Sequence, residues 1–118
     1  MAMRDFVKSF KALSDETRIR ILKILLEREC CVCEVMQALG ISQSRASRNL
    51  GILEDAGFVK SNRDGLWIVY CIDEQKMDSH AGPLTELLRG SLANEQVILQ
   101  DKERLGRAVR VGPKALPK

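Results

Sequence analysis

Three of the four cysteines fall within four consecutive positions, at Cys30, Cys31 and Cys33. Cysteine thiolates are soft ligands that favour soft ions, so this cluster could hold a metal or a metalloid. On a helix, residues i and i+2 lie on opposite sides, whereas in an extended segment they point the same way. The spacing of Cys31 and Cys33 therefore predicts a chelating pair on non-helical backbone. A helix that begins there would favour the thiolate form.

The number and spacing of the sulfurs narrow the choice of ion. Structural zinc takes four ligands and usually a wider spacing between paired cysteines. A trivalent arsenic or antimony centre takes three thiolates, whose negative charges neutralise it. We expect Cys30 to supply the third sulfur, although the chain must then bend between Cys30 and Cys31. Cys71 lies in an apolar predicted strand, where core packing is the better interpretation, and it stays open as the alternative third ligand.

A second group of candidate residues lies on a helix that we expect from Ser42 to about Ala56, because Ser42 can cap it and Gly57 can end it. On a helical wheel, its apolar residues share one side and its polar residues lie opposite. The N-terminal half of the exposed face carries side chains that can contact base edges in the major groove of DNA. These are Gln43, Ser44, Ser47 and Arg48.

The surrounding elements suggest a winged helix–turn–helix. Apolar periodicity predicts further helices over residues 4–13, 16–28, 33–39 and 83–92. β-forming residues predict strands over residues 58–62 and 66–73, joined by the turn Arg63-Asp64-Gly65. We expect Lys60 on the first strand and Arg63 at the tip of this hairpin to contact phosphates. The apolar run of the second strand predicts burial on both faces.

These elements predict a mainly α fold with a small β-hairpin (α+β). We expect residues 1–94 to form a winged helix–turn–helix domain for DNA binding and dimerisation. Residues 95–118 are expected to form a basic, mobile C-terminal extension, and its part after Gly106 is expected to be extended because it lacks periodicity. The first helix and the leucine-striped last helix are the available dimer surfaces.

Composition excludes several classes of protein. With 118 residues, 45% of them hydrophobic and 30% charged, the chain fits one packed domain. Its longest apolar run is too short to span a membrane, and the charged N-terminus has no signal-peptide core, so we expect a cytoplasmic protein with reduced cysteines. The single histidine, His80, and the lack of a nucleophile–base constellation argue against an enzyme.

Three segments resemble the ArsR/SmtB family of bacterial metal-sensing repressors. Residues 13–22 are similar to the opening signature of the family, residues 42–50 to its recognition helix, and residues 54–59 to the entry to its wing. Cys31-Val32-Cys33 closely resembles the cysteine motif of the family's arsenic sensors. Two positions depart from the pattern: Met36 stands where the prototype has a third cysteine, and Asn49 where many members have histidine.

The resemblance implies a homodimeric repressor that binds double-stranded operator DNA and dissociates when As(III) or Sb(III) binds its cysteine thiolates. We keep two alternatives. In the first, the same cysteines sense oxidants or reactive sulfur by forming a disulfide. In the second, the chain is a winged-helix protein-interaction module without a DNA function.

Overall fold

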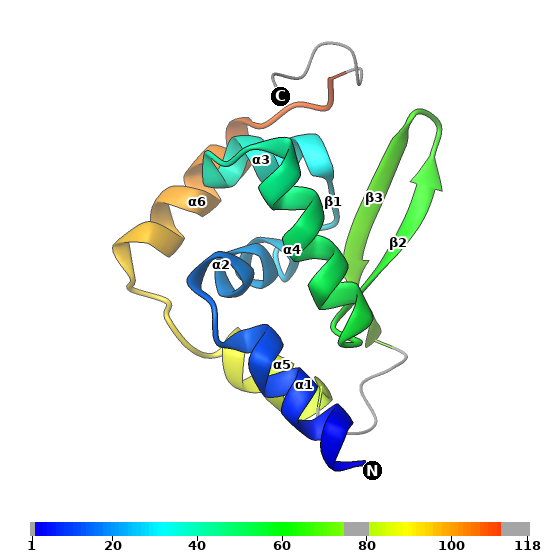
Figure 1. Cartoon of the computed structure of the whole chain (residues 1–118). Helices are drawn as coiled ribbons and strands as arrows, with labels where there is room; N and C mark the ends of the chain where they lie inside the picture. Colours follow the sequence, from blue (N-terminus) through cyan, green and yellow to red (C-terminus); the bar gives the residue numbers. More distant parts are fainter. Residues whose placement is uncertain (1, 75–80, 112–118) are drawn as a thin grey trace.

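The computed structural model describes residues 2–74 and 81–111 (Figure 1). His80 and the tail residues Lys114 and Lys118 lie outside the described residues. In chain order, the elements are α1 (Met3–Leu13), α2 (Glu16–Leu25), β1 (Cys30–Cys31), α3 (Val32–Leu39), α4 (Gln43–Asp55), β2 (Val59–Asp64), β3 (Trp67–Ile72), α5 (Ala81–Arg89) and α6 (Gln96–Arg107). The expectation of a mainly helical chain with a small hairpin is confirmed.

Local signals in the sequence explain where α2, α3 and α4 begin and end. The Asp15 carboxylate accepts a hydrogen bond from the Arg18 N–H at 3.0 Å, and the Ser42 hydroxyl accepts one from the Arg45 N–H at 3.2 Å. Gly40 ends α3 with a left-handed φ of 68°. The tight turn between α3 and α4 is therefore fixed by one glycine and one serine.

The sheet has three antiparallel strands in the order β1-β3-β2. Two expectations about the hairpin are wrong. Arg63 does not lie in the turn but is paired with Ile68 within the strands, so Gly65 and Leu66 form the tip. Strand β3 is not buried on both faces, because the outer part of the hairpin extends beyond the core and leaves Ile68 39% exposed.

The core forms around α2. Ile21, Leu22 and Ile24 are at most 1% exposed and pack with Leu50 of α4 and Phe58. None of the described helices is long and apolar enough to cross a membrane.

Helix α6 was not expected and corrects the interpretation of the segment after residue 94. It packs against α2 and α3 (Figure 1). The buried Asp101 accepts hydrogen bonds from Arg20 at 2.8 and 2.9 Å. Residues 96–107 are thus helical and fastened to the core rather than mobile. Residues 108–111 leave the helix, as expected, but lie against α3 and the wing.

Candidate functional site

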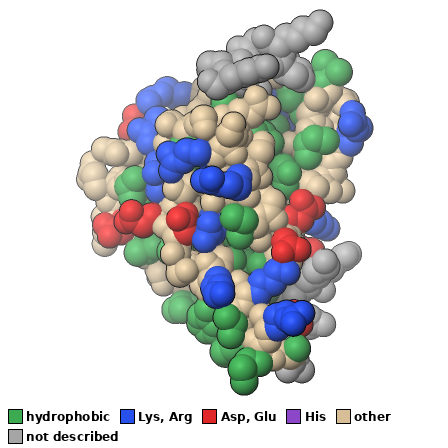
Figure 2. Space-filling view, viewed as in Figure 1, with side chains coloured by type: hydrophobic (Ala, Val, Ile, Leu, Met, Phe, Trp, Pro, Cys, Tyr) green, Lys and Arg blue, Asp and Glu red, His purple; other side chains and the backbone are tan. Residues whose placement is uncertain are grey.

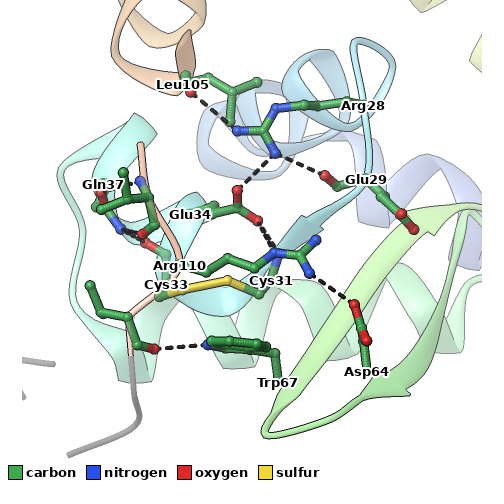
Figure 3. Close-up of a disulfide and its surroundings, with 12 residues drawn as sticks. Arg28, Glu29, Cys31, Cys33, Glu34, Gln37, Asp64, Trp67, Leu105 and Arg110 are labelled. Atoms are coloured by element: carbon green, nitrogen blue, oxygen red, sulfur yellow. Dashed lines mark hydrogen bonds and ion pairs between the residues drawn. A yellow bond between two sulfur atoms is a disulfide. The ribbon is translucent and has the colours of Figure 1, made fainter. Parts of the chain in front are cut away.

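Cys31 and Cys33 lie together where β1 passes into α3, and they are joined by a disulfide (Figure 3). Their Cα atoms are 5.4 Å apart, and both side chains are buried. They pack with Val69 of β3 in a small apolar cluster that is separate from the main core. The two sulfurs lie together, as predicted, but as a disulfide rather than as reduced thiols. Only Cys31 lies on extended backbone, because α3 already begins at Val32 and Cys33 is its second residue.

Cys30 lies on the opposite face of β1. It pairs in register with Tyr70, and its side chain belongs to the main core, while Cys31 pairs with Val69. Burial raises the pKa of the Cys30 thiol to about 12, so this thiol resists ionisation at neutral pH. The structure thus does not bring Cys30 to the other two sulfurs. Met36, at the prototype position of the third ligand, also lies in the main core.

Cys71 lies on the same side of the sheet as Cys31. It is two residues from Val69 on β3, and alternate residues of a strand share a face. It is half-buried, and burial raises the pKa of its thiol. In register terms it is a diagonal neighbour of Cys31, on the same face but not directly opposite. Within the part of the chain that the structure describes, three metal-binding side chains do not meet at one point.

The Glu34 carboxylate lies beside the disulfide and accepts several hydrogen bonds there. It accepts hydrogen bonds from the Cys31 N–H at 2.9 Å, from Arg28 at 2.8 Å and from Arg110 at 3.1 Å. Burial works against the ionised form, but these three donors outweigh it and hold the pKa of Glu34 below its ordinary value. An ionised carboxylate thus fixes the backbone at the first sulfur.

A cavity of about 160 Å³ connects the cysteine pair to the expected DNA-binding elements. Its lining includes both cysteines, the first residue of α4, the tip and first residue of β3, and one residue after α6: Cys31, Cys33, Gln43, Leu66, Trp67 and Val111. The paired sulfurs therefore border the space between the start of α4 and the wing.

Helix α4 presents the expected polar face to solvent. Gln43, Ser44, Ser47 and Arg48 are all exposed. Gly51 follows them on the same face, and the space where its Cβ would lie is open. Several Lys and Arg side chains stand on the side of the molecule that carries α4 (Figure 2).

Asn49 is instead turned inward. Its side-chain oxygen accepts a hydrogen bond from Arg18 at 3.1 Å, and its amide donates one to the Arg45 carbonyl at 2.9 Å. Asn49 therefore joins α4 to Arg18 of α2.

The two basic residues of the hairpin lie at different depths. Lys60 is half-buried opposite Cys71, while Arg63 is exposed near the tip. Strand β2 is also tied to α4, because the Ser61 hydroxyl donates a hydrogen bond to Glu54 at 2.8 Å. Ser61 thus ties the wing to α4, and Arg63 is exposed to solvent near the tip.

Three further residues of this region were missed in the sequence: Gln37 of α3, Trp67 of β3 and Arg110 after α6. Their side chains surround the disulfide in Figure 3. Trp67 is the single tryptophan of the chain, and an aromatic residue beside a turn is a weak signal that could have drawn attention to it. The contacts of Gln37 with Val109 and of Arg110 with Glu34 join positions more than 70 residues apart, so no local pattern in the sequence indicates them.

Comparison with known families gives a direct result. Residues 15–61 match the family described as "Bacterial regulatory protein, arsR family". Arsenic resistance transcriptional regulator ArsR2 of Pseudomonas putida is 37% identical over 107 residues, which cover 86% of this chain and 90% of that protein.

Two further relatives match over shorter stretches. A CadC homolog of Staphylococcus aureus, named as a cadmium resistance transcriptional regulatory protein, is 40% identical over 70% of this chain and 65% of its own length. Arsenic resistance transcriptional regulator ArsR1 of P. putida is 47% identical over 52% of this chain and 48% of its own length. This chain therefore spans about half to two thirds of these two relatives.

Solved structures agree with the fold. A homodimeric winged helix-turn-helix DNA-binding domain from Mycobacterium bovis is 28% identical, with a TM-score of 0.65 over 74% of this chain and 77% of that one. Reduced HlyU from Vibrio cholerae is 29% identical, with a TM-score of 0.62 over 72% of this chain and 85% of that one.

Together, the capped helix–turn–helix, the adjoining hairpin and these matches define a winged-helix transcriptional regulator. The chain belongs to the ArsR family of bacterial regulatory proteins. Members of this family regulate transcription and are not enzymes. The predicted fold class and family are confirmed, while the predicted DNA-contacting and metal-binding residues stay predictions.

Proposed function

We propose that this chain is a metalloid-responsive repressor that binds operator DNA as a homodimer and releases it when As(III) or Sb(III) binds its cysteines. One observation carries the proposal: Cys31 and Cys33 line the same cavity as Gln43 of α4 and Trp67 of the wing. An ion held by the two sulfurs lies between the elements that would contact DNA. Relatives named for arsenic resistance support the choice of ion.

Binding would be a condensation. Each thiol gives its proton to a hydroxyl of arsenous acid, one As–O bond breaks as one As–S bond forms, and one water leaves for each sulfur. Cys31 and Cys33 supply the first two sulfurs once a thiol reductant has given two electrons and two protons to their disulfide. Cys30 is our predicted third ligand, and it must leave the core and bend the chain at β1 to reach the ion. That movement would disturb β1 and the start of α3.

The dimer would form through α1 and α5. Four apolar residues of α1 are exposed, namely Met3, Phe6, Val7 and Phe10, and apolar side chains gather at this end of the molecule in Figure 2. Leu87 of α5 is also 67% exposed. Such a patch is typical of a surface between subunits. A two-fold axis there would present two copies of α4 to successive major grooves, ~34 Å apart.

The first test is an electrophoretic shift on DNA from upstream of the gene for this protein, with the cysteines kept fully reduced. The metal-free protein should retard the DNA, and arsenite should release it. Typical coupling of ~1–3 kcal/mol corresponds to roughly 5–150-fold weaker binding. Retardation that arsenite leaves unchanged would contradict the proposal.

The disulfide favours a second candidate function, in which the pair senses an oxidant. Cys31 and Cys33 would give two electrons and two protons to the oxidant, and the S–S bond would form without other rearrangement. Under full reduction this function predicts no response to arsenite, so the same experiment separates the two. Salt-insensitive or absent DNA binding would instead favour a protein-interaction module.

A further inference from the structure

The segment Ala108–Val111 crosses the cysteine pair after α6 and is fastened to α3 at its first half. The Gln37 side-chain amide donates a hydrogen bond to the Val109 carbonyl at 2.7 Å, and the Gln37 side-chain oxygen accepts one from the Val109 N–H at 3.1 Å. Two bonds between one side chain and one residue fix both the position and the direction of the segment. We call Ala108–Val111 the strap.

The second half of the strap is fastened to the wing. The Arg110 guanidinium donates to Glu34 at 3.1 Å and to Asp64 near the hairpin tip at 3.0 Å (Figure 3). The Trp67 indole N–H donates to the Val111 carbonyl at 2.8 Å. Arg110 also lies 5.9 Å from the centre of the Trp67 ring. The strap thus connects α3 to the end of the wing that would meet DNA.

The strap also touches the cysteines. Val111 packs into the cluster formed by Cys31, Cys33 and Val69. The same Glu34 oxygen that accepts from Arg110 accepts from the Cys31 N–H, so one atom joins the strap to the backbone of the first sulfur. Any change in the separation of the sulfurs or in the path of β1 therefore acts on the packing of Val111 and on the bond between Glu34 and Arg110.

We propose that Gln37 and Arg110 are positioning residues, which hold the strap so that the chemical state of the Cys31–Cys33 pair sets the position of the wing. This inference rests on the proposed regulation of DNA binding through these cysteines. The strap holds the wing tip against α3 while Val111 sits on the paired sulfurs. A ligand that separates the sulfurs lifts Val111 and weakens the hold on Asp64 and Trp67.

The test measures hydrogen–deuterium exchange of the amides in the wing, Val59–Ile72, for the full chain in the reduced state, with arsenite, and with diamide. Diamide takes two electrons and two protons from the two thiols, is itself reduced to the hydrazine, and leaves the disulfide. The wild-type protein should show wing exchange that differs among the three states. Arg110→Ala and Gln37→Ala should show faster wing exchange, equal in all three states.

DNA affinity measured in parallel should respond to arsenite by less than about twofold in the two strap variants. Arg107→Ala is the matched control, because the ion pair of Arg107 with Glu103 at 2.8 Å is exposed and stays within α6. It should behave as the wild type, and circular dichroism should show all variants folded.

The outcomes separate the two proposals. If the wild-type wing responds to diamide but not to arsenite, and the strap variants respond to neither, the strap is supported and the arsenic-responsive function fails. If either strap variant responds as the wild type does, or if the wild-type wing responds to neither reagent, the strap proposal is overturned.

Discussion

Cys30 and Cys31 are neighbours in the chain but lie on opposite faces of β1, Cys30 in the main core and Cys31 in the small cluster beside the wing. This arrangement follows from extended backbone, in which adjacent side chains diverge. Two sulfurs, those of Cys31 and Cys33, therefore lie at the candidate site. A third sulfur would have to reach this site from another position, so its source can be tested.

X-ray absorption at the arsenic edge answers that question. If the predicted set of Cys30, Cys31 and Cys33 is correct, the wild-type protein shows three sulfurs around arsenic, Cys30→Ser shows two, and Cys71→Ser keeps three. The burial that raises the pKa of Cys30 to about 12 must be overcome on binding, so arsenite uptake should be slow near neutral pH and faster as pH rises. Three sulfurs that persist in Cys30→Ser but not in Cys71→Ser would assign the third ligand to the wing.

Arg48→Ala should weaken binding to the operator while leaving arsenite affinity unchanged, because Arg48 is exposed on α4 and does not line the cavity. One lost base contact costs about 1–3 kcal/mol and relaxes specificity at one position. Competition titrations against operator DNA with single base changes measure both effects. Ser47→Ala is the companion variant. Unchanged affinity in both variants would show that this face of α4 does not contact the DNA bases.

Arg63→Ala should weaken binding to every DNA sequence alike. The side chain is exposed near the hairpin tip, and a phosphate contact carries no sequence information. The slope of log affinity against log salt should fall by about one for each lost contact. A loss confined to the operator sequence would show that Arg63 contacts a base instead.

Glu34 links stability to pH. Its pKa is held below the ordinary glutamate value of 4.5, so the unfolded chain binds the proton more readily than the folded chain. The stabilisation is therefore complete above that ordinary value and is lost as the pH falls from it toward the lower pKa of the folded state. Urea unfolding at several pH values should show this loss in the wild type.

Glu34→Gln should remove that part of the pH dependence and cost about 1–3 kcal/mol at neutral pH, since Arg28 and Arg110 lose a charged acceptor. Glu103→Gln is the control, because its carboxylate is exposed on α6. Equal pH profiles for the wild type and Glu34→Gln would show that ionisation of Glu34 does not contribute to the free energy of unfolding.

The local parts of this fold could be read from the sequence, and the distant contacts could not. The turn between α3 and α4 depends on Gly40 and Ser42, whose effects reach only a few residues. Strand β1 has two residues and exists because Cys30 and Cys31 pair with β3 about forty positions later. A strand of two residues is too short to give a periodic pattern in the sequence.

Helix α6 was missed for a different physical reason. Its buried residues are Ile98, Asp101 and Leu105, a helical spacing in which the middle member is charged. Asp101 is tolerated there because Arg20 of α2 pairs with it from 81 positions away. The charged Asp101 interrupts the apolar stripe of α6. Its partner, Arg20, can be identified only from the structure.

The central claim is that an ion on Cys31 and Cys33 controls DNA binding. The most direct measurement is the operator affinity of fully reduced protein, followed by fluorescence anisotropy as arsenite is added, for Cys31→Ser, Cys33→Ser and Cys71→Ser beside the wild type. We expect all four proteins to bind DNA, and arsenite to release the wild type and Cys71→Ser but neither of the other two. Release that persists in Cys31→Ser or Cys33→Ser would contradict the account.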